Sequence, residues 1–184
     1  LKTERDREIL KALVKTADVF VENYRPGAFE ALGLGYEALA AINPRLIYCA
    51  ISGFGQTGPE RLGAGYDGKI QALSGIMSIT GHAETGPTRA GFAVCDVLSG
   101  ATAAFGVSSA LFQRTHTGKG QLVDVSMLEA TLAFLSGQVA DYSVAGHRQQ
   151  LSGNQAGSRR ATANLFKAGD GYLLLAVNSE KQYI

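Results

Sequence analysis

The segment that most constrains the fold spans residues 46–52, which read LIYCAIS and are apolar almost throughout. A strand with one solvent-exposed face alternates apolar and polar residues. A strand of a parallel sheet is covered by helices on both faces and is apolar along its length. Residues 46–52 therefore predict a buried central strand. Residues 17–23, rich in β-branched and aromatic side chains, predict a neighbouring strand.

Segments with helical spacing alternate with these strands. Apolar residues at Ile9, Leu10, Leu13 and Val14 recur as they do on one face of a helix. The remaining predicted elements are, in chain order, a weak helix at 36–41, a short helix near 70–79 inside a glycine-rich loop region, a long helix from Asp96 to Thr117, a strand at 121–126, a helix from Met127 to about Val144 and a final strand at 172–177.

This alternation predicts an α/β fold with an open parallel sheet, in which ligands bind beyond the carboxyl ends of the strands. That rule directs attention to three segments: residues 23–27, residues 53–68 and the start of the helix at Asp96. Residues 145–163 are polar and rich in Gly and Arg, so we expect a linker there, followed by the start of a second domain.

Composition and charge exclude several classes of partner. The net charge of +1 leaves no basic surface for nucleic acid or for an anionic membrane. The sequence contains no run of about eighteen apolar residues, which a membrane-spanning helix would need. The first residues are polar and do not resemble a signal peptide. Cys49 and Cys95 lack a paired spacing and read as free thiols, which favours a cytoplasmic protein. Without an initiating Met, the chain is expected to be a piece of a longer protein.

Two sequence features suggest cofactors that other features argue against. Residues 53–58 read GFGQTG and match the glycine pattern of dinucleotide-binding folds, but Pro59 and further glycines continue the loop where a helix should begin. His82, His116 and His147 are too far apart for metal-ligand spacing. We therefore expect no redox cofactor and no metal.

Asp96 stands where the long predicted helix begins, and two roles fit it. An Asp at a helix start commonly caps the first turn. The same placement keeps a carboxylate ionised, through the helix dipole and the backbone N–H groups, as a carboxylate nucleophile requires. The residues alone leave both roles open.

Two further segments offer ligand-binding groups. Asn23, Tyr24 and Arg25 follow a predicted strand and supply an amide, an aromatic face and a guanidinium, which suit an adenine nucleotide or its phosphates. An ordinary turn with a solvated Arg25 is the alternative. Tyr66 and Asp67 lie in the glycine-rich region, where the ring of Tyr66 could pack and Asp67 could form a local turn.

Several motifs in register resemble one known family, the class III coenzyme A transferases, which include formyl-CoA transferase, carnitine CoA-transferase and succinyl-CoA-dependent dicarboxylate transferases. The matching segments are residues 1–3 (LKT), 21–27 (VENYRPG), 43–47 (NPRLI), 52–59 (SGFGQTGP), 65–67 (GYD), 74–81 (SGIMSITG), Asp96, 117–121 (TGKGQ) and 153–154 (GN).

This resemblance implies a Rossmann-like large domain, a small domain and two interlocked subunits. Residues 1–150 would form part of the large domain, and residues 151–184 the linker and the beginning of the small domain. Asp96 would be the nucleophile, Asn23, Tyr24 and Arg25 would line the coenzyme A site, and Tyr66 would lie near the acyl group. The implied substrates are an acyl-CoA and small carboxylic acids, with coenzyme A passing through aspartyl anhydride and aspartyl thioester intermediates.

Alternatives remain within the resemblance. One branch of the family consists of α-methylacyl-CoA racemases, which use a His where this chain has Tyr66; a tyrosine is a poor base at neutral pH. A non-catalytic coenzyme A-binding remnant is the other alternative. Gly153-Asn154 is not followed by the glycine run of formyl-CoA transferase, which argues against formate or oxalate as substrate, whereas Arg159 and Arg160 suit a dicarboxylate. The sequence does not identify the donor or acceptor acid.

Overall fold

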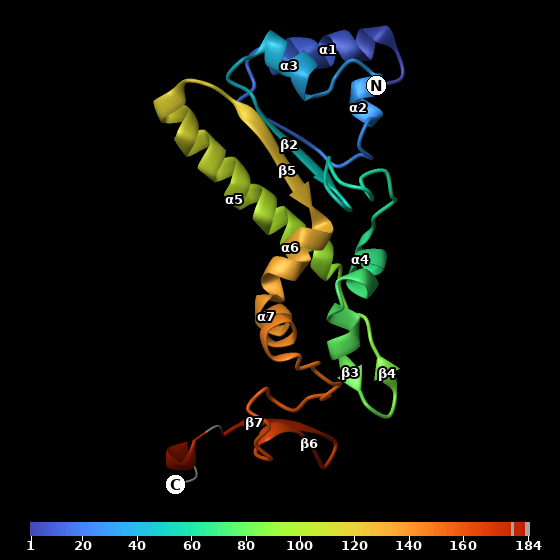
Figure 1. Ribbon diagram of the computed structural model, residues 1–184, viewed down its shortest axis with the longest axis vertical. Helices are drawn as coiled ribbons and strands as arrows, with labels where there is room; N and C mark the ends of the chain where they lie inside the picture. Colours follow the sequence, from blue (N-terminus) through green and yellow to red (C-terminus); the bar gives the residue numbers. More distant parts are fainter. Residues whose placement is uncertain (178, 183–184) are drawn as a thin grey trace.

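A parallel sheet of three strands forms the centre of the upper part of the molecule (Figure 1). The computed structural model describes residues 1–177 and 179–182. The strands are β1 (Val19–Glu22), β2 (Ile47–Ser52) and β5 (Gln121–Ser126), in the order β1-β2-β5, with Ile47 of the central strand facing Val19 on one side and Gln121 on the other. The predicted α/β fold with a parallel sheet is confirmed.

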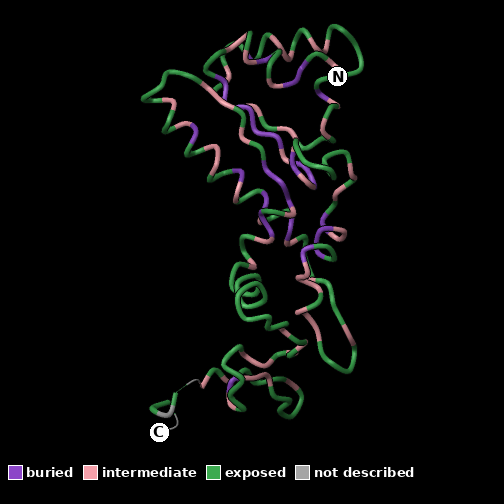
Figure 2. Tube along the Cα trace, in the orientation of Figure 1, coloured by how far each residue is buried: buried purple, intermediate pink, exposed green. Residues whose placement is uncertain are grey.

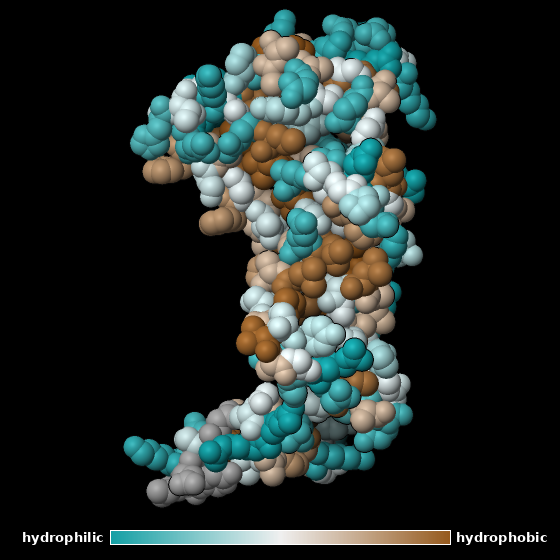
Figure 3. Space-filling model, in the orientation of Figure 1, coloured by the Kyte–Doolittle hydropathy of each residue, from teal (hydrophilic) through white to brown (hydrophobic). Residues whose placement is uncertain are grey.

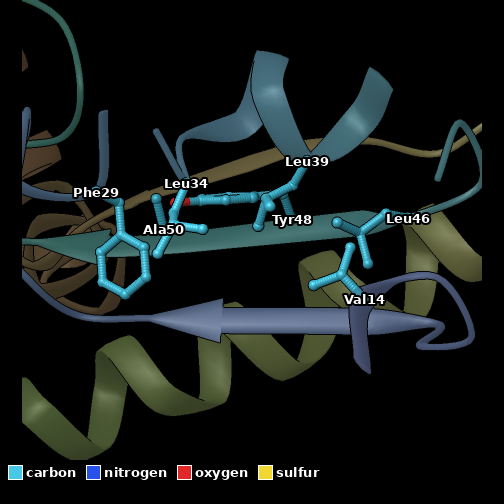
Figure 4. Close-up of a cluster of buried hydrophobic side chains, with 7 residues drawn as sticks. All are labelled: Val14, Phe29, Leu34, Leu39, Leu46, Tyr48 and Ala50. Carbon is cyan, nitrogen blue, oxygen red and sulfur yellow. The ribbon is translucent and has the colours of Figure 1, made fainter. Parts of the chain in front are cut away.

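One face of the sheet is covered by the N-terminal helices α1 (Glu4–Val14), α2 (Ala28–Ala31) and α3 (Tyr36–Ile42). Five of the six β2 residues are buried, as the apolar run predicts. The ring of Tyr48 packs 5.1 Å from that of Phe20 between their centres. The cluster buried under these helices consists of Val14, Phe29, Leu34, Leu39, Leu46, Tyr48 and Ala50 (Figure 4).

The other face is covered by α5 (Val94–Thr117), which packs Ala103 against Cys49 and Val125. Gly106 permits this approach, because a Cβ atom there would lie 2.8 Å from Val123 Cγ1. The helix ends at Gly118, whose left-handed backbone (φ 69°) supplies the predicted stop. Although α5 is long and apolar enough to span a membrane, with a mean hydropathy of 1.4, here it packs on β2 and β5.

The lower part of the molecule is more open. Figure 2 shows buried residues concentrated along β2 and around α4, with much of the C-terminal part exposed. The other elements are α4 (Asp67–Leu73), η1 (Ile76–Ile79), the short strands β3 (Gly81–His82) and β4 (Gly86–Pro87), α6 (Met127–Phe134), α7 (Ser136–Ala145), the antiparallel pair β6 (Ala163–Ala168) and β7 (Gly171–Ala176), and η2 (Glu180–Gln182).

The structure corrects three predicted boundaries. The long helix begins at Val94 with Ala93 as its N-cap, so the predicted start at Asp96 is two residues late and the alternative in which Asp96 caps the helix is wrong. The predicted helix over residues 127–144 is two helices that meet at Leu135. The last strand has a partner, β6, that the sequence analysis missed. The β6–β7 hairpin lies at the opposite end of the molecule from the sheet (Figure 1), and the domain boundary near residue 150 stays a prediction.

Candidate active site

A cleft of about 520 Å³ opens beyond the carboxyl ends of β1 and β2, beside the first turns of α5. This is where open α/β sheets bind their ligands. Its walls include all five residues singled out from the sequence: Asn23, Tyr24, Arg25, Tyr66 and Asp96. The structure therefore brings together side chains that are more than seventy positions apart in the chain.

Glycines form the floor of the cleft. Gly53 follows β2 directly, and its backbone approaches that of Gly65 so closely that a Cβ atom on Gly53 would lie 2.6 Å from Gly65 Cα. The Asp124 carboxylate holds the next turn of the loop by accepting a hydrogen bond from Gln56 N at 3.0 and 3.1 Å. No helix begins within residues 53–58, which agrees with the rejection of a dinucleotide-binding motif there.

The segment after β1 presents Tyr24 and Arg25 to the cleft. Glu22 accepts a hydrogen bond from Tyr24 N at 2.7 Å, and the Phe29 ring supports the Tyr24 ring edge to face at 5.2 Å between ring centres. Tyr24 is nevertheless 60% exposed. Arg25 is exposed, and among the described residues its guanidinium makes no hydrogen bond or ion pair. The aromatic ring of Tyr24 and the guanidinium of Arg25 thus both line the cleft and are available to a ligand.

Asp96 is the third residue of α5 and is exposed. Within the part of the chain that the structure describes, its carboxylate makes no hydrogen bond. Burial raises the pKa of this carboxyl, and the nearby charge of Asp67 raises it further. This direction runs against the expectation that the helix start holds Asp96 ionised. The result is a carboxylate without a protein partner, which can react with a ligand in the cleft.

Asp67 performs the capping that the sequence analysis gave to Asp96. Its Oδ1 accepts a hydrogen bond from Cys95 N at 2.9 Å, in the first turn of α5. Asp67 is only 8% exposed and lies 28 positions before Cys95, so local capping rules could not have found it. The prediction of a local turn at Asp67 missed this long-range role.

The side chains next to Asp67 and Asp96 differ in exposure: Tyr66 is exposed and Cys95 is buried. Tyr66 is 67% exposed, so the alternative in which its ring packs into the protein is wrong. Cys95 is a free thiol, as predicted, and is fully buried; burial raises the pKa of the thiol, so Cys95 packs in the core and is not a nucleophile. No three His, Cys, Asp or Glu side chains gather as a metal site in residues 1–177 and 179–182.

The chain is similar to known proteins along its length. The model of CoA-transferase family III matches residues 1–184. The chain is 39% identical over 183 residues to the succinate–glutarate CoA-transferase of Agrobacterium fabrum, covering 100% of this chain and 46% of that protein. It is 47% identical over 156 residues to the acetyl-CoA:oxalate CoA-transferase of Acetobacter aceti, covering 84% of this chain and 40% of that protein.

Among solved structures, a CAIB/BAIF family protein from Brucella suis superposes with a TM-score of 0.91 at 38% identity. The match covers 99% of this chain and 48% of that one. The chain therefore spans less than half the length of these relatives. Since the family model matches from end to end, the chain belongs to CoA-transferase family III.

Proposed function

We propose that the protein transfers coenzyme A from an acyl-CoA donor to a small carboxylic acid, with Asp96 carrying the covalent intermediates. One observation carries the proposal: among the described residues the Asp96 carboxylate has no hydrogen-bond or ion-pair partner, and it shares a cleft with Asn23, Tyr24 and Arg25. The transferase names of the relatives support the reaction class.

The chemistry starts with an Asp96 oxygen attacking the thioester carbonyl carbon. A C–O bond forms, the C–S bond breaks, and the products are an aspartyl anhydride and the coenzyme A thiolate. The thiolate then attacks the aspartyl carbonyl and releases the donor acid, leaving a thioester on Asp96. An acceptor carboxylate reverses both steps. The raised pKa of Asp96 makes its ionised oxygen a stronger nucleophile.

Arg25 and Tyr24 supply the groups for holding coenzyme A. A guanidinium pairs with phosphate oxygens, and an exposed aromatic face stacks on an adenine ring. Asn23 adds an amide that can donate and accept hydrogen bonds. In this proposal Tyr66 contacts the acyl group, because its exposed ring lines the same cleft as Asp96.

A dicarboxylate is the proposed acceptor. Relatives are named for glutarate and oxalate, so oxalate belongs in the test panel despite the missing glycine run. Arg159 and Arg160 are both exposed, and Arg159 adopts a left-handed backbone (φ 54°). If these arginines select dicarboxylates, Arg159→Ala and Arg160→Ala should reduce turnover with glutarate more than turnover with a monocarboxylate of equal length.

A further part of the proposal is that the protein works as an interlocked homodimer in the cytoplasm. Large apolar side chains are exposed on α5, α6 and α7, and Figure 3 shows apolar surface gathered around the middle of the molecule. These side chains are Val97, Phe105, Phe112, Phe134, Val139 and Val144. Burying them would favour association. Sedimentation of the whole protein tests this expectation.

One assay separates the three candidate activities in the whole protein. Incubation with an acyl-CoA followed by hydroxylamine should yield a hydroxamate on Asp96 if transfer is correct. Exchange of the α-proton without an acceptor acid would instead indicate the racemase, which the exposed Tyr66 does not favour. Binding of coenzyme A with neither reaction would leave a binding module.

A further inference from the structure

We propose that Asp67 and Gln71 form a clamp from α4 that fixes the chain entering α5 and thereby positions the Asp96 carboxylate in the cleft. The inference rests on the proposed function, because it gives these two residues a role only through Asp96. It assigns them no contact with substrate, so they are positioning residues.

The first contact of the clamp is Asp67, which is 8% exposed. Its Oδ1 accepts the hydrogen bond from Cys95 N at 2.9 Å, and its Oδ2 accepts one from Gln71 Nε2 at 2.7 Å. Cys95 directly precedes Asp96, so this bond holds the peptide unit between Val94 and Cys95, one residue before the backbone that carries the Asp96 side chain. Bonds to an ionised acceptor are about twice as strong as neutral ones.

The second contact is Gln71, which is completely buried. Its Oε1 accepts a hydrogen bond from Ala90 N at 2.9 Å, and its Nε2 also approaches the Phe92 carbonyl oxygen at 3.4 Å. Residues 88–93 form no helix or strand. Gln71 therefore holds this irregular segment at two backbone groups, and Asp67 holds the first turn of the helix that carries Asp96.

Arg89 completes the clamp from the solvent side. Its Nη2 lies 3.5 Å from Asp67 Oδ2, and its side chain is 62% exposed. A buried carboxylate is costly without compensation, and Arg89 with the two hydrogen-bond donors provides it. These contacts offset the cost of burying the Asp67 side chain, whose Oδ1 accepts the hydrogen bond from the first turn of α5.

The same arrangement places charges around Asp96. Asp67 faces it from α4, Arg25 lines the cleft from the segment after β1, and Arg89 stands beyond Asp67. Tyr66 and the buried Cys95 thiol are the other neighbouring titratable groups, and burial raises the pKa of the thiol. Burial is the larger cause of the raised pKa of Asp96, and the charge of Asp67 is the second cause. Removing the Asp67 charge would therefore lower the pKa of Asp96.

The test compares variants of the whole protein by pre-steady-state trapping of the Asp96 adduct, by titration with coenzyme A and by the pH dependence of kcat/KM. Asp67→Ala removes both acceptor oxygens. Asp67→Asn keeps an acceptor for Cys95 N, removes the charge and replaces the acceptor of Gln71 Nε2 with an amide donor. Asp18→Asn is the matched control, because Asp18 anchors the other end of α5 through Arg114 at 2.7 Å. Arg114 lies eighteen residues beyond Asp96, about 27 Å along the helix.

Asp67→Ala should slow adduct formation by roughly 10- to 100-fold, because misplacing a reactive group by about 1 Å has effects of that size. The Kd for coenzyme A should change less than about threefold, since the clamp does not touch Arg25 or Tyr24. Asp67→Asn should move the acid limb of the pH dependence of kcat/KM to lower pH. Asp18→Asn should neither slow adduct formation nor move that limb.

Two results overturn the clamp: an Asp67→Ala adduct rate within twofold of the original protein, or an Asp67→Asn pH profile that matches that of Asp18→Asn. If Asp67→Ala does not fold, the Asp67→Asn profile decides alone. Failure of the proposed function looks different, because then the unsubstituted protein itself forms no adduct on Asp96.

Discussion

Replacing Gly53 with alanine should destabilise the protein and disturb the cleft floor. The added Cβ atom would lie 2.6 Å from Gly65 Cα and 3.0 Å from Gly65 N, whereas ordinary contact begins near 3.4 Å. Both neighbours are backbone atoms, so no side-chain rotation relieves the overlap. The segments that carry Ser52 and Tyr66 must move apart, and overpacking of this kind costs about 1–3 kcal/mol.

Urea unfolding measures this cost. With a slope of about 2 kcal/mol per molar, the midpoint should fall by about 0.5–1.5 M. Gly91→Ala is the matched control, because no atom lies within 4 Å of its added Cβ and its φ is not positive. A surface change of that kind should stay within about 0.25 M. A Gly53→Ala midpoint equal to that of Gly91→Ala would refute the close approach of these segments.

Three further predictions concern the cleft. Asp96→Asn should raise Tm near pH 7, because the raised pKa of Asp96 means that its ionised form opposes folding. The gain in Tm should vanish near pH 3, where Asp96 is protonated in both the folded and the unfolded protein. A gain that persists near pH 3 contradicts the reasoning. Ser52→Ala should leave stability equal or higher by urea unfolding, since its buried Oγ has no partner among the described residues; a loss above about 1 kcal/mol argues for a missed bond. Arg25→Ala should weaken coenzyme A binding about 10-fold or more by calorimetry, with partial recovery in Arg25→Lys, and unchanged affinity would remove Arg25 from the site.

The sheet was predictable because the pattern of apolar residues in a strand reflects how far the strand is buried. Residues 46–52 are apolar on both faces, and the structure buries them on both faces. The stop at Gly118 was predictable as well, since glycine readily adopts the left-handed backbone found there. Both features depend on local chemistry that a single sequence displays.

Features that depend on distant residues could not be predicted in the same way. Capping of α5 was one of two roles that the residues left open for Asp96, but Asp67 reaches that turn from 28 positions away and accepts the hydrogen bond from Cys95 N. The strand β6 was overlooked because its residues Asn164 to Lys167 show weak alternation, and only pairing with β7 reveals it. The break at Leu135 did have a local signal, because Ser136 and Gly137 follow it directly and such a dipeptide often marks a turn or a kink; the predicted helix ran through it.

For the candidate site, the residues and the resemblance contributed differently. The rule that ligands bind beyond strand ends directed attention to residues 23–27 and to the segment that includes Tyr66. The resemblance alone favoured the nucleophile role of Asp96 over capping. Folding then brings Asn23, Tyr24, Arg25, Tyr66 and Asp96 to one cleft. Their roles in binding and transfer stay predictions.

The central claim is that an Asp96 oxygen exchanges with the substrates, and isotope transfer tests it most directly. The whole protein would turn over unlabelled acyl-CoA with an acceptor acid whose carboxylate carries ¹⁸O, and mass spectrometry of the Asp96 peptide would follow. When the acceptor attacks the aspartyl thioester, its oxygen becomes the bridge of the anhydride and stays on Asp96 after the thiolate departs with the acyl group. The proposed route predicts ¹⁸O in Asp96 during turnover, whereas product formation with no label in Asp96 would contradict it.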